Sequence, residues 1–179
     1  MRTIAIFAVL VTTTVFADEP QPNGPALRVL EQQGVLVKGV RTGSNASPHR
    51  VTYLGLGKQW KGSGAALNAI PGHSVMLLSI HDNPRVSDAT LQSLRGLDVK
   101  YVKLTNVNVT NAGVEQIASM TGIKTLSLKK VAITDDAIPA LAKLQSLERL
   151  NLWGTALSPE GVAKLRIALP NCKIYASWW

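Results

Sequence analysis

The sequence is poor in cysteine, with Cys172 alone in 179 residues. No intramolecular disulfide can form, even in an oxidising compartment, so the stability of the fold must come from packing. We interpret Cys172 as a small buried apolar residue rather than a reactive thiol, because free cysteines are among the most buried residues. Charged residues are also scarce, at 17% against 46% hydrophobic residues, which argues against disorder and favours one globular domain.

The patterns that would support catalysis or cofactor binding are missing. His49, His73 and His81 are not at metal-ligand spacing, and the sequence has no cysteine pair. It has neither a G-x-G-x-x-G nor a P-loop pattern. Ser79, His81 and Asp82 include the residue types of a nucleophilic triad, but Ser79 and His81 would be successive outward positions of one strand, with no orienting group implied. We therefore predict no enzyme activity, no metal and no cofactor.

Long apolar runs are rare, and the one at the start predicts a secretory signal peptide over residues 1–17, MRTIAIFAVLVTTTVFA, cut after Ala17. It combines the basic Arg2, an apolar run over residues 4–11 and small residues before the cut. A buried first helix or a membrane anchor is the alternative, but the run is short for a span of about 20 residues. No later segment predicts a membrane span. The expected location is therefore secreted, or periplasmic in the cell envelope.

Basic residues outnumber acidic ones, with 19 Lys and Arg against 11 Asp and Glu and a net charge of +8. Removing residues 1–17 takes away Arg2 and no acid, so the mature charge is +8 minus 1, or +7. This charge favours acidic partners, such as anionic glycans, anionic surfaces or acidic proteins. Export argues against nucleic acid as a physiological target.

The chain repeats an apolar pattern every 24 residues. Each unit begins with an anchor, followed three and five residues later by further apolar residues, in an L-x-x-L-x-L pattern that predicts a strand. The anchors are Val51, Val75, Val99, Ile123 and Leu147. The second row is Leu54, Leu78, Val102, Leu126 and Leu150, and the third is Leu56, Ile80, Leu104, Leu128 and Leu152.

The second half of each unit changes to helical spacing, with apolar pairs three residues apart. A capping hydroxyl precedes each predicted helix, where it can accept a bond from an unpaired N–H. These caps are Ser63, Ser87, Thr110, Thr134 and Ser158. Pro159 suits a first helical position, whereas Pro139 falls inside its predicted helix and would remove one backbone bond.

A strand, a turn and a helix of two to three turns form a unit too small to bury its own apolar face, so the units must stack. Stacking predicts an α/β solenoid shaped like a short horseshoe, with a parallel sheet on the concave side, helices on the convex side, and about five repeats plus end caps. The N-terminal cap should contain a helix over 25–34 closed by Gly34, a strand over 35–40 and a mobile loop over 41–49. The predicted organisation is a signal peptide over 1–17, an N-terminal cap over 18–50, repeats over 51–170 and a C-terminal capping strand over 171–179, with Trp178 and Trp179 covering the last repeat.

Two segments, LNLWGTALSPEGVAKL and LSLKKVAITDDAIPAL, resemble leucine-rich repeats of the ribonuclease-inhibitor-like class. They have the L-x-L-x-x-T-x-I-T-D-x-G-L form of small secreted bacterial proteins of unassigned function, and the resemblance covers residues 51–176. It implies a right-handed leucine-rich-repeat solenoid. The Asn or Thr expected eight residues after each anchor is present as Asn83 and Thr155. Elsewhere Gln59, Val107 and Val131 replace it, so no continuous asparagine ladder is expected.

Alternate residues of each predicted strand should face outward on the concave side. Three outward columns follow. They are Tyr53, Leu77, Tyr101, Thr125 and Arg149; Gly55, Ser79, Lys103, Ser127 and Asn151; and Gly57, His81, Thr105, Lys129 and Trp153, extended by Lys173, Tyr175 and Ser177. This face has four cations, four aromatic rings and no carboxylate. Lys103, Lys129, Arg149 and Trp153 were therefore expected to converge on one ligand.

The columns predict a secreted, non-catalytic binding module that recognises a protein or an anionic glycan. The predicted ligand-binding residues are Tyr53, Leu77, His81, Tyr101, Lys103, Lys129, Arg149, Asn151, Trp153, Lys173 and Tyr175. Two alternatives stay open. In the first, the face carries residues that simply suit a solvated sheet; in the second, the chain is a structural component that self-associates in the cell envelope. A monomer or a weak homo-oligomer is expected.

Overall fold

The computed structural model of the protein describes residues 32–42, 49–62, 67, 75–120 and 122–177. For residues 37–42 and 49–52 only the backbone is described. The predicted signal peptide, nearly all of the helix predicted over 25–34, the cap Ser63, and Trp178 and Trp179 lie outside the described residues.

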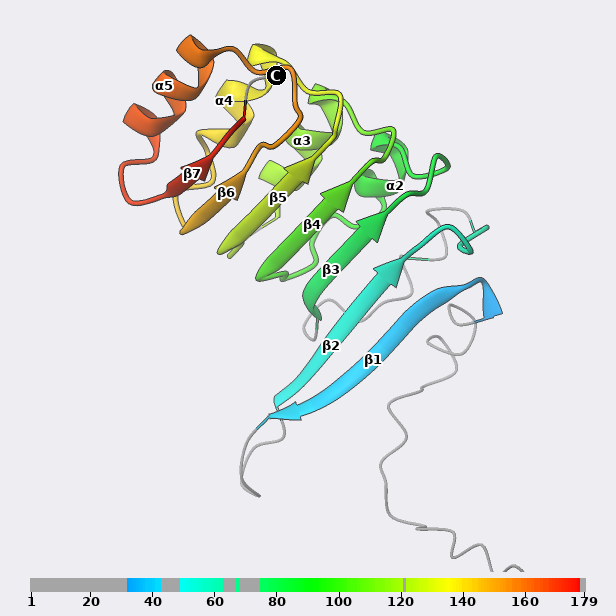
Figure 1. The fold of residues 1–179 in the computed structure, drawn as a ribbon. Helices are drawn as coiled ribbons and strands as arrows, with labels where there is room; N and C mark the ends of the chain where they lie inside the picture. The colour runs from blue at the N-terminus through cyan, green and yellow to red at the C-terminus, as the bar shows by residue number, and fades with distance from the viewer. Residues whose placement is uncertain (1–31, 43–48, 63–66, 68–74, 121, 178–179) are drawn as a thin grey trace, which may run out of the picture.

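Seven strands form one sheet in the order of the sequence, β1 to β7 (Figure 1). β1 is antiparallel to β2, and every later neighbour pair is parallel. The predicted α/β class with a mostly parallel sheet is confirmed. The strands are β1 (Val35–Thr42), β2 (His49–Leu56), β3 (Val75–His81), β4 (Tyr101–Thr105), β5 (Thr125–Lys129), β6 (Arg149–Asn151) and β7 (Lys173–Tyr175).

The register aligns the predicted apolar rows. The pairing runs from Leu54 to Leu78, Val102, Leu126 and Leu150, each 24 residues from the last. All five side chains are at most 1% exposed, so they form a single interior row. The third row, from Leu56 to Leu152, is buried to the same degree. The repeat in the sequence is therefore a repeat in space, in which each strand covers the apolar edge of the one before it.

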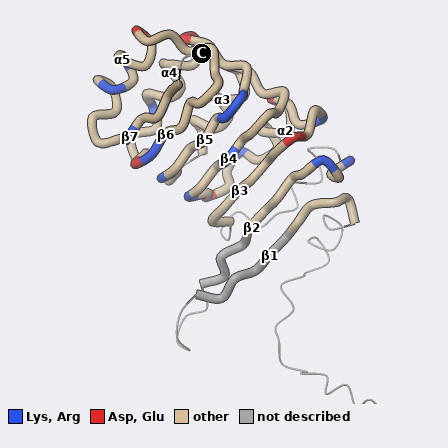
Figure 2. The backbone as a smooth tube through the Cα atoms, viewed as in Figure 1, with Lys and Arg blue, Asp and Glu red and all other residues tan. Residues whose placement is uncertain are grey.

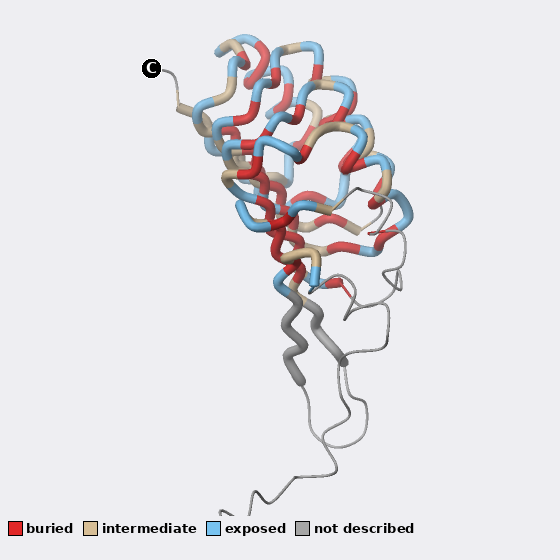
Figure 3. Tube along the Cα trace, turned by 90° about the vertical axis from the view of Figure 1, so that its right-hand side faces the viewer, coloured by how far each residue is buried: buried red, intermediate tan, exposed pale blue. Residues whose placement is uncertain are grey.

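The helices lie together on one side of the sheet in Figure 1. Buried segments recur in both the strands and the helices when the molecule is turned by 90° (Figure 3). Each helix places its predicted apolar residues in the core, for example Leu91, Val114, Leu141 and Leu165. The helices are α2 (Asp88–Gln92), α3 (Asn111–Ala118), the 3-10 helix η2 (Asp135–Ala137) followed by α4 (Ile138–Leu141), and α5 (Pro159–Ala168).

Three of the predicted helix caps make the expected hydrogen bond. The hydroxyl oxygens of Thr110 and Ser158 accept from backbone N–H groups at 3.3 and 2.9 Å, and that of Thr134 accepts at 3.4 Å. Ser87 also occupies the N-cap position, and its N–H donates to the Thr90 hydroxyl at 3.3 Å. The caps satisfy donors that the first helical turn would otherwise leave unpaired.

The caps are also linked from one unit to the next. The Asp88 carboxylate accepts from the N–H of Thr110 at 2.9 Å and from its hydroxyl at 2.7 Å. Asn111 accepts from the N–H of Thr134 at 3.0 Å and donates to its hydroxyl at 2.8 Å. Asp135 accepts from the N–H of Ser158 at 2.9 Å and from its hydroxyl. We call these three pairs, Asp88–Thr110, Asn111–Thr134 and Asp135–Ser158, the cap ladder.

Glycine makes room for the carboxylates of the cap ladder. A Cβ at Gly113 would overlap the Asp88 carboxylate, and one at Gly161 would overlap that of Asp135. The corresponding residue of the intervening unit is Ala137, where the ladder residue is the amide Asn111. The helix position therefore holds glycine where the cap-ladder residue is a carboxylate, and alanine where it is an amide.

Two local predictions were wrong. The loop predicted over 41–49 is shorter, because β1 and β2 keep pairing as far as Thr42 and His49. Pro139 does not interrupt a helix, since the chain forms η2 first and Pro139 then lies in the first turn of α4. A proline costs little there, because the N–H groups of that turn have no intrahelical partner.

The expected interruption of the asparagine ladder is present in the described units. Asn83 is 1% exposed, and its amide donates to the carbonyls of Gly57 at 2.8 Å and Trp60 at 3.1 Å. Val107 and Val131 are buried apolar residues at the corresponding positions. These turns are therefore held by apolar packing instead of a buried amide.

Candidate ligand-binding face

The side of the sheet opposite the helices carries the three predicted columns; we call it the open face. The pairing aligns Tyr53, Leu77, Tyr101, Thr125, Arg149 and Lys173 in one column. It aligns Gly55, Ser79, Lys103, Ser127, Asn151 and Tyr175 in the next. In the third column His81, Thr105 and Lys129 are paired, and Trp153 follows the end of β6.

Exposure varies along the open face. The exposed predicted site residues are His81, Lys103, Arg149, Lys173 and Tyr175, and the half-buried ones are Tyr53, Leu77, Tyr101, Lys129, Asn151 and Trp153. Gly55 and Ser79 were predicted to face solvent, but both are buried. At Gly55 the ring of Tyr53 lies 3.0 Å from where a Cβ would be, so a larger neighbour covers this small residue.

In the part of the chain that the structure describes, no outward cation of the strands forms an ion pair with a carboxylate. Basic positions recur along β4, β5 and β6 and the turns beside them (Figure 2). Within the described residues, the ion pairs are Lys100–Asp98 at 2.7 Å and Lys124–Glu148 at 3.2 Å. Both pairs lie just before strands. The outward cations of the strands themselves therefore remain available to an acidic ligand.

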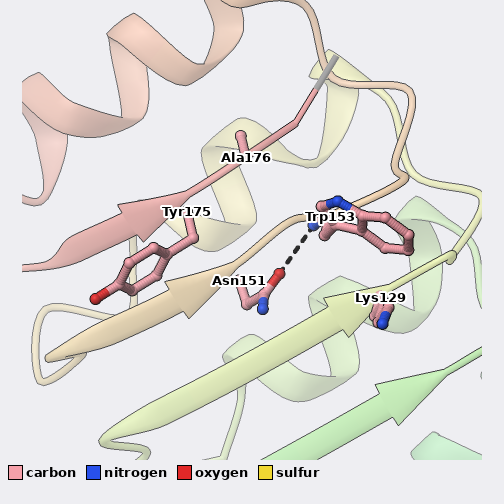
Figure 4. Close-up of a pocket in the computed structure, with 5 residues that line it drawn as sticks. All are labelled: Lys129, Asn151, Trp153, Tyr175 and Ala176. Atoms are coloured by element: carbon pink, nitrogen blue, oxygen red, sulfur yellow. Dashed lines mark hydrogen bonds between the residues drawn. The ribbon is translucent and has the colours of Figure 1, made fainter. Parts of the chain in front are cut away.

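A hollow of about 280 Å³ lies at the β5–β7 end of the open face (Figure 4). We call it the β5–β7 hollow; it is lined by Lys129, Asn151, Trp153, Tyr175 and Ala176. The side-chain amide oxygen of Asn151 accepts from the backbone N–H of Trp153 at 3.0 Å, which holds the turn that presents the indole. Tyr175 is 54% exposed and offers a second aromatic surface.

Two lysines hold their ammonium groups over the Trp153 ring. The Nζ of Lys129 lies 4.3 Å from the ring centroid and that of Lys130 lies 5.7 Å from it. Lys130 has a positive φ of 52°, and its N–H donates to the Trp153 carbonyl at 2.9 Å. The aromatic face stabilises these cations by cation–π attraction. Among the described residues that line the β5–β7 hollow, Lys129 is a cation and none is a carboxylate.

A second hollow, of about 430 Å³, lies at the other end of the open face. We call it the β1–β3 hollow; it is lined by Gly34, Leu36, Tyr53, Gly55, Gly57, Lys58, Gln59, His81 and Asp82. Leu36 is 49% exposed, so an aliphatic side chain faces solvent there. The two hollows differ in chemistry, since this one is walled by apolar groups and has charges of both signs at its rim.

Asp82, just after β3, adds a carboxylate beside the three columns, which themselves contain none. A hydrogen bond from the Asn106 amide, at 2.8 Å, and the positive charges of Lys58 and Lys130 hold the Asp82 pKa below its usual value. The carboxylate is therefore an anion at the rim of the β1–β3 hollow. Its bond to Asn106 also means that Asp82 is oriented by the neighbouring turn.

The hollows gather six of the eleven predicted site residues. Lys129, Asn151, Trp153 and Tyr175 meet in one, and Tyr53 and His81 in the other. The remaining five line neither: Leu77, Tyr101, Lys103, Arg149 and Lys173. The structure thus brings Lys129 and Trp153 together, whereas Lys103 and Arg149 lie outside the β5–β7 hollow.

Sequence reasoning missed several lining or neighbouring residues: Leu36, Lys58, Gln59, Asp82, Lys130 and Ala176. Two signals were available. Gly55 and Gly57 occupy successive outward positions of one strand, which removes side chains from the face there. Lys130 follows directly after the outward Lys129, at the residue where the chain turns.

The described residues outside the open face offer little evidence for another kind of site. In the described segments, no group of three His, Cys, Asp or Glu side chains is placed to hold a metal ion. Cys172 is half-buried against the core, and burial raises the pKa of its thiol. Cys172 thus packs against the core as predicted but is only half-buried, whereas a buried residue was expected. None of the helices that the structure describes has the length and apolar character needed to cross a membrane.

Comparisons with known proteins give little beyond this description. No family model matches the chain, and no curated protein matches its sequence. Among solved structures, it is similar to the LRR ectodomain of the receptor kinase SOBIR1 from Arabidopsis thaliana, with 16% sequence identity and a TM-score of 0.49. The match covers 85% of this chain and 89% of that one. The similarity is too low to transfer a partner or an activity.

Proposed function

We propose that the chain is an exported, non-catalytic leucine-rich-repeat module whose open face binds an acidic ligand, either a protein or an anionic glycan. The observation that carries this proposal is the pair of ammonium groups over Trp153, beside the β5–β7 hollow. The ring positions the cations, and Asn151 and Tyr175 supply hydrogen-bonding groups next to them. Lys103, Arg149 and Lys173, all exposed, extend the positive surface across the sheet.

Binding to immobilised heparin and to poly-glutamate, measured at several salt concentrations, tests the proposal. Lys129→Glu should weaken binding at least tenfold, because it removes one positive charge and adds a negative one at the hollow, and tenfold corresponds to about 1.4 kcal/mol. Trp153→Ala should weaken it by about threefold or more, since the ring no longer positions the two ammonium groups.

The matched control is Lys143→Glu, which makes the same charge change at an exposed lysine just after α4. It should alter binding by less than about twofold, because the residue lies away from the open face. Equal losses from Lys129→Glu and Lys143→Glu would mean that only net charge matters. That result, or no binding to either probe, would reject the proposal.

Self-association is the second candidate, and β1 favours it. This strand is eight residues long and lies at the edge of the sheet, with β2 as its neighbour among the described strands. An edge strand presents unpaired N–H and C=O groups that can pair with a second copy. Sedimentation of the purified chain over a range of concentrations tests this. A stable homo-oligomer would favour a structural role, and a monomer at all concentrations would remove it.

A further inference from the structure

The β1–β3 hollow exists because two successive outward positions have no side chain, Gly55 in β2 and Gly57 just after β2 ends. A Cβ at Gly57 would lie 3.5 Å from the His81 imidazole, an ordinary contact distance. A Cβ at Gly55 would lie 3.0 Å from the Tyr53 ring and 3.3 Å from the Leu36 Cβ. Glycine thus forms the floor, and larger neighbours stand around it as walls.

The walls are suited to an uncharged group. Leu36 is 49% exposed, and Tyr53 contributes part of an aromatic ring. At the rim, the cation Lys58 and the anion Asp82 offset each other. The hollow measures about 430 Å³, toward the small end of ligand pockets, and a buried aromatic side chain removes roughly 150–250 Å² from water. An apolar or aromatic side chain would therefore be stabilised there by burial.

We propose that the β1–β3 hollow binds an apolar or aromatic side chain of a protein partner, whose acidic residues reach Lys103 and the β5–β7 hollow. This inference rests on the proposed function and selects the protein form of the ligand. An anionic glycan would place hydroxyl groups against the Leu36 side chain, which offers them no hydrogen-bonding group.

The register predicts the spacing of the partner residues. From β2 to Lys103 on β4 is two strand spacings, about 10 Å, and to Lys129 on β5 is three, about 14 Å. An extended peptide advances about 3.3 Å per residue. A segment that crosses the strands should therefore have its apolar residue separated from its acidic residues by about three to five positions.

Selection from a random peptide library, with peptides of about 12 residues to exceed this span, tests the inference on the full chain. We expect enriched peptides to share one large apolar residue and acidic residues at the predicted distance. Replacing the apolar residue of a selected peptide by Ala should weaken binding by about tenfold. Affinities are measured by fluorescence anisotropy with labelled peptides.

Two variants address the hollow itself. Gly57→Leu projects a side chain into the hollow, and Leu36→Ser removes an apolar wall. Each variant should lower the affinity for a selected peptide by about tenfold. The matched control is Ile167→Ser, because Ile167 is an 81% exposed aliphatic residue on α5. It should change the affinity by less than about twofold. Circular dichroism melting of each variant shows whether it still folds.

The outcomes separate this inference from the proposed function. Peptides that depend on Lys129 but bind Gly57→Leu and Leu36→Ser as well as the native chain would overturn the inference and leave the proposed function standing. If no peptide is enriched but heparin still binds through Lys129, the inference is overturned, the proposed function stands, and the ligand is a glycan. Failure to bind either probe would reject both.

Discussion

The two sides of the sheet follow different rules. On the covered side, the same residue class returns in every unit, as in the row from Leu54 to Leu150, where all five side chains are at most 1% exposed. On the open face, the aligned residues change from Gly55 to Ser79, Lys103, Ser127 and Asn151. Packing between units constrains one side, because each unit must fit the next. The other side can vary without loss of fold, which is where recognition can be built.

The largest expected effect comes from breaking the covered side. Leu126→Ala removes a buried side chain from the middle of the interior row, and its neighbours can collapse only partly into the cavity. We expect the free energy of unfolding to fall by about 2–5 kcal/mol. Ser127→Ala, one residue along on the open face, should change it by less than about 0.5 kcal/mol. Urea unfolding measures both, and similar losses would contradict the comparison.

A smaller effect should come from Gly161→Ala in α5. An alanine in a helix is usually more stable than a glycine by up to about 1 kcal/mol. Here the added Cβ would overlap the Asp135 carboxylate, so we expect a loss of roughly 1–3 kcal/mol instead.

The double variant Asp135→Ala, Gly161→Ala supplies the control, because it removes the group with which the Cβ collides. In this background, Gly161→Ala should be neutral or stabilising in thermal melting. A loss of the same size with and without Asp135 would show that the carboxylate is not the cause.

The smallest effect should be a change in pH dependence. Hydrogen bonds from the hydroxyl and N–H of Ser158 hold the pKa of Asp135 below its usual value. The folded state thus binds this proton less tightly than the unfolded one. The stabilisation is complete above the unfolded pKa and is lost as the pH falls through the folded one.

Asp135→Asn should therefore flatten the acid limb of stability below about pH 4 and leave the fold intact. Asn111 already binds the N–H and the hydroxyl of Thr134 in the neighbouring unit, where the hydroxyl accepts instead of donating. Thermal melting from pH 5 to pH 2 compares the variant with the native chain, and an unchanged acid limb would rule out this role for Asp135.

Much of the covered side could be predicted from the sequence, because its causes are local or periodic. The interior rows follow from the spacing of Leu54, Leu78 and their successors, and the helix caps follow from hydroxyls such as Thr110. The cap ladder could not be predicted. Its partners are 22 or 23 residues apart, and they meet only because of how closely neighbouring units stack.

The sequence predicted which strand residues lie on the open face, but it did not predict the two hollows. Alternation placed Lys129 and Trp153 on it, but the second ammonium group, from Lys130, depends on a turn with positive φ. The β1–β3 hollow depends on Leu36, which reaches the face through the antiparallel pairing of β1 with β2. A pattern of parallel repeats gives no sign of that reversal. Whether the predicted site residues bind a ligand stays a prediction.

The constant register also means that whole units can be removed or added without changing how the remaining strands pair. Because β4 and β5 pair at an offset of 24 residues, excising residues 101–124 would place β3 beside β5 with matching rows. The two hollows would then approach each other by one strand spacing, about 4.8 Å. Asp88 would meet the unit containing Ala137, so the excision would also need Ala137→Gly. Ligand length would thus be selected in whole steps, set by how many units the chain contains.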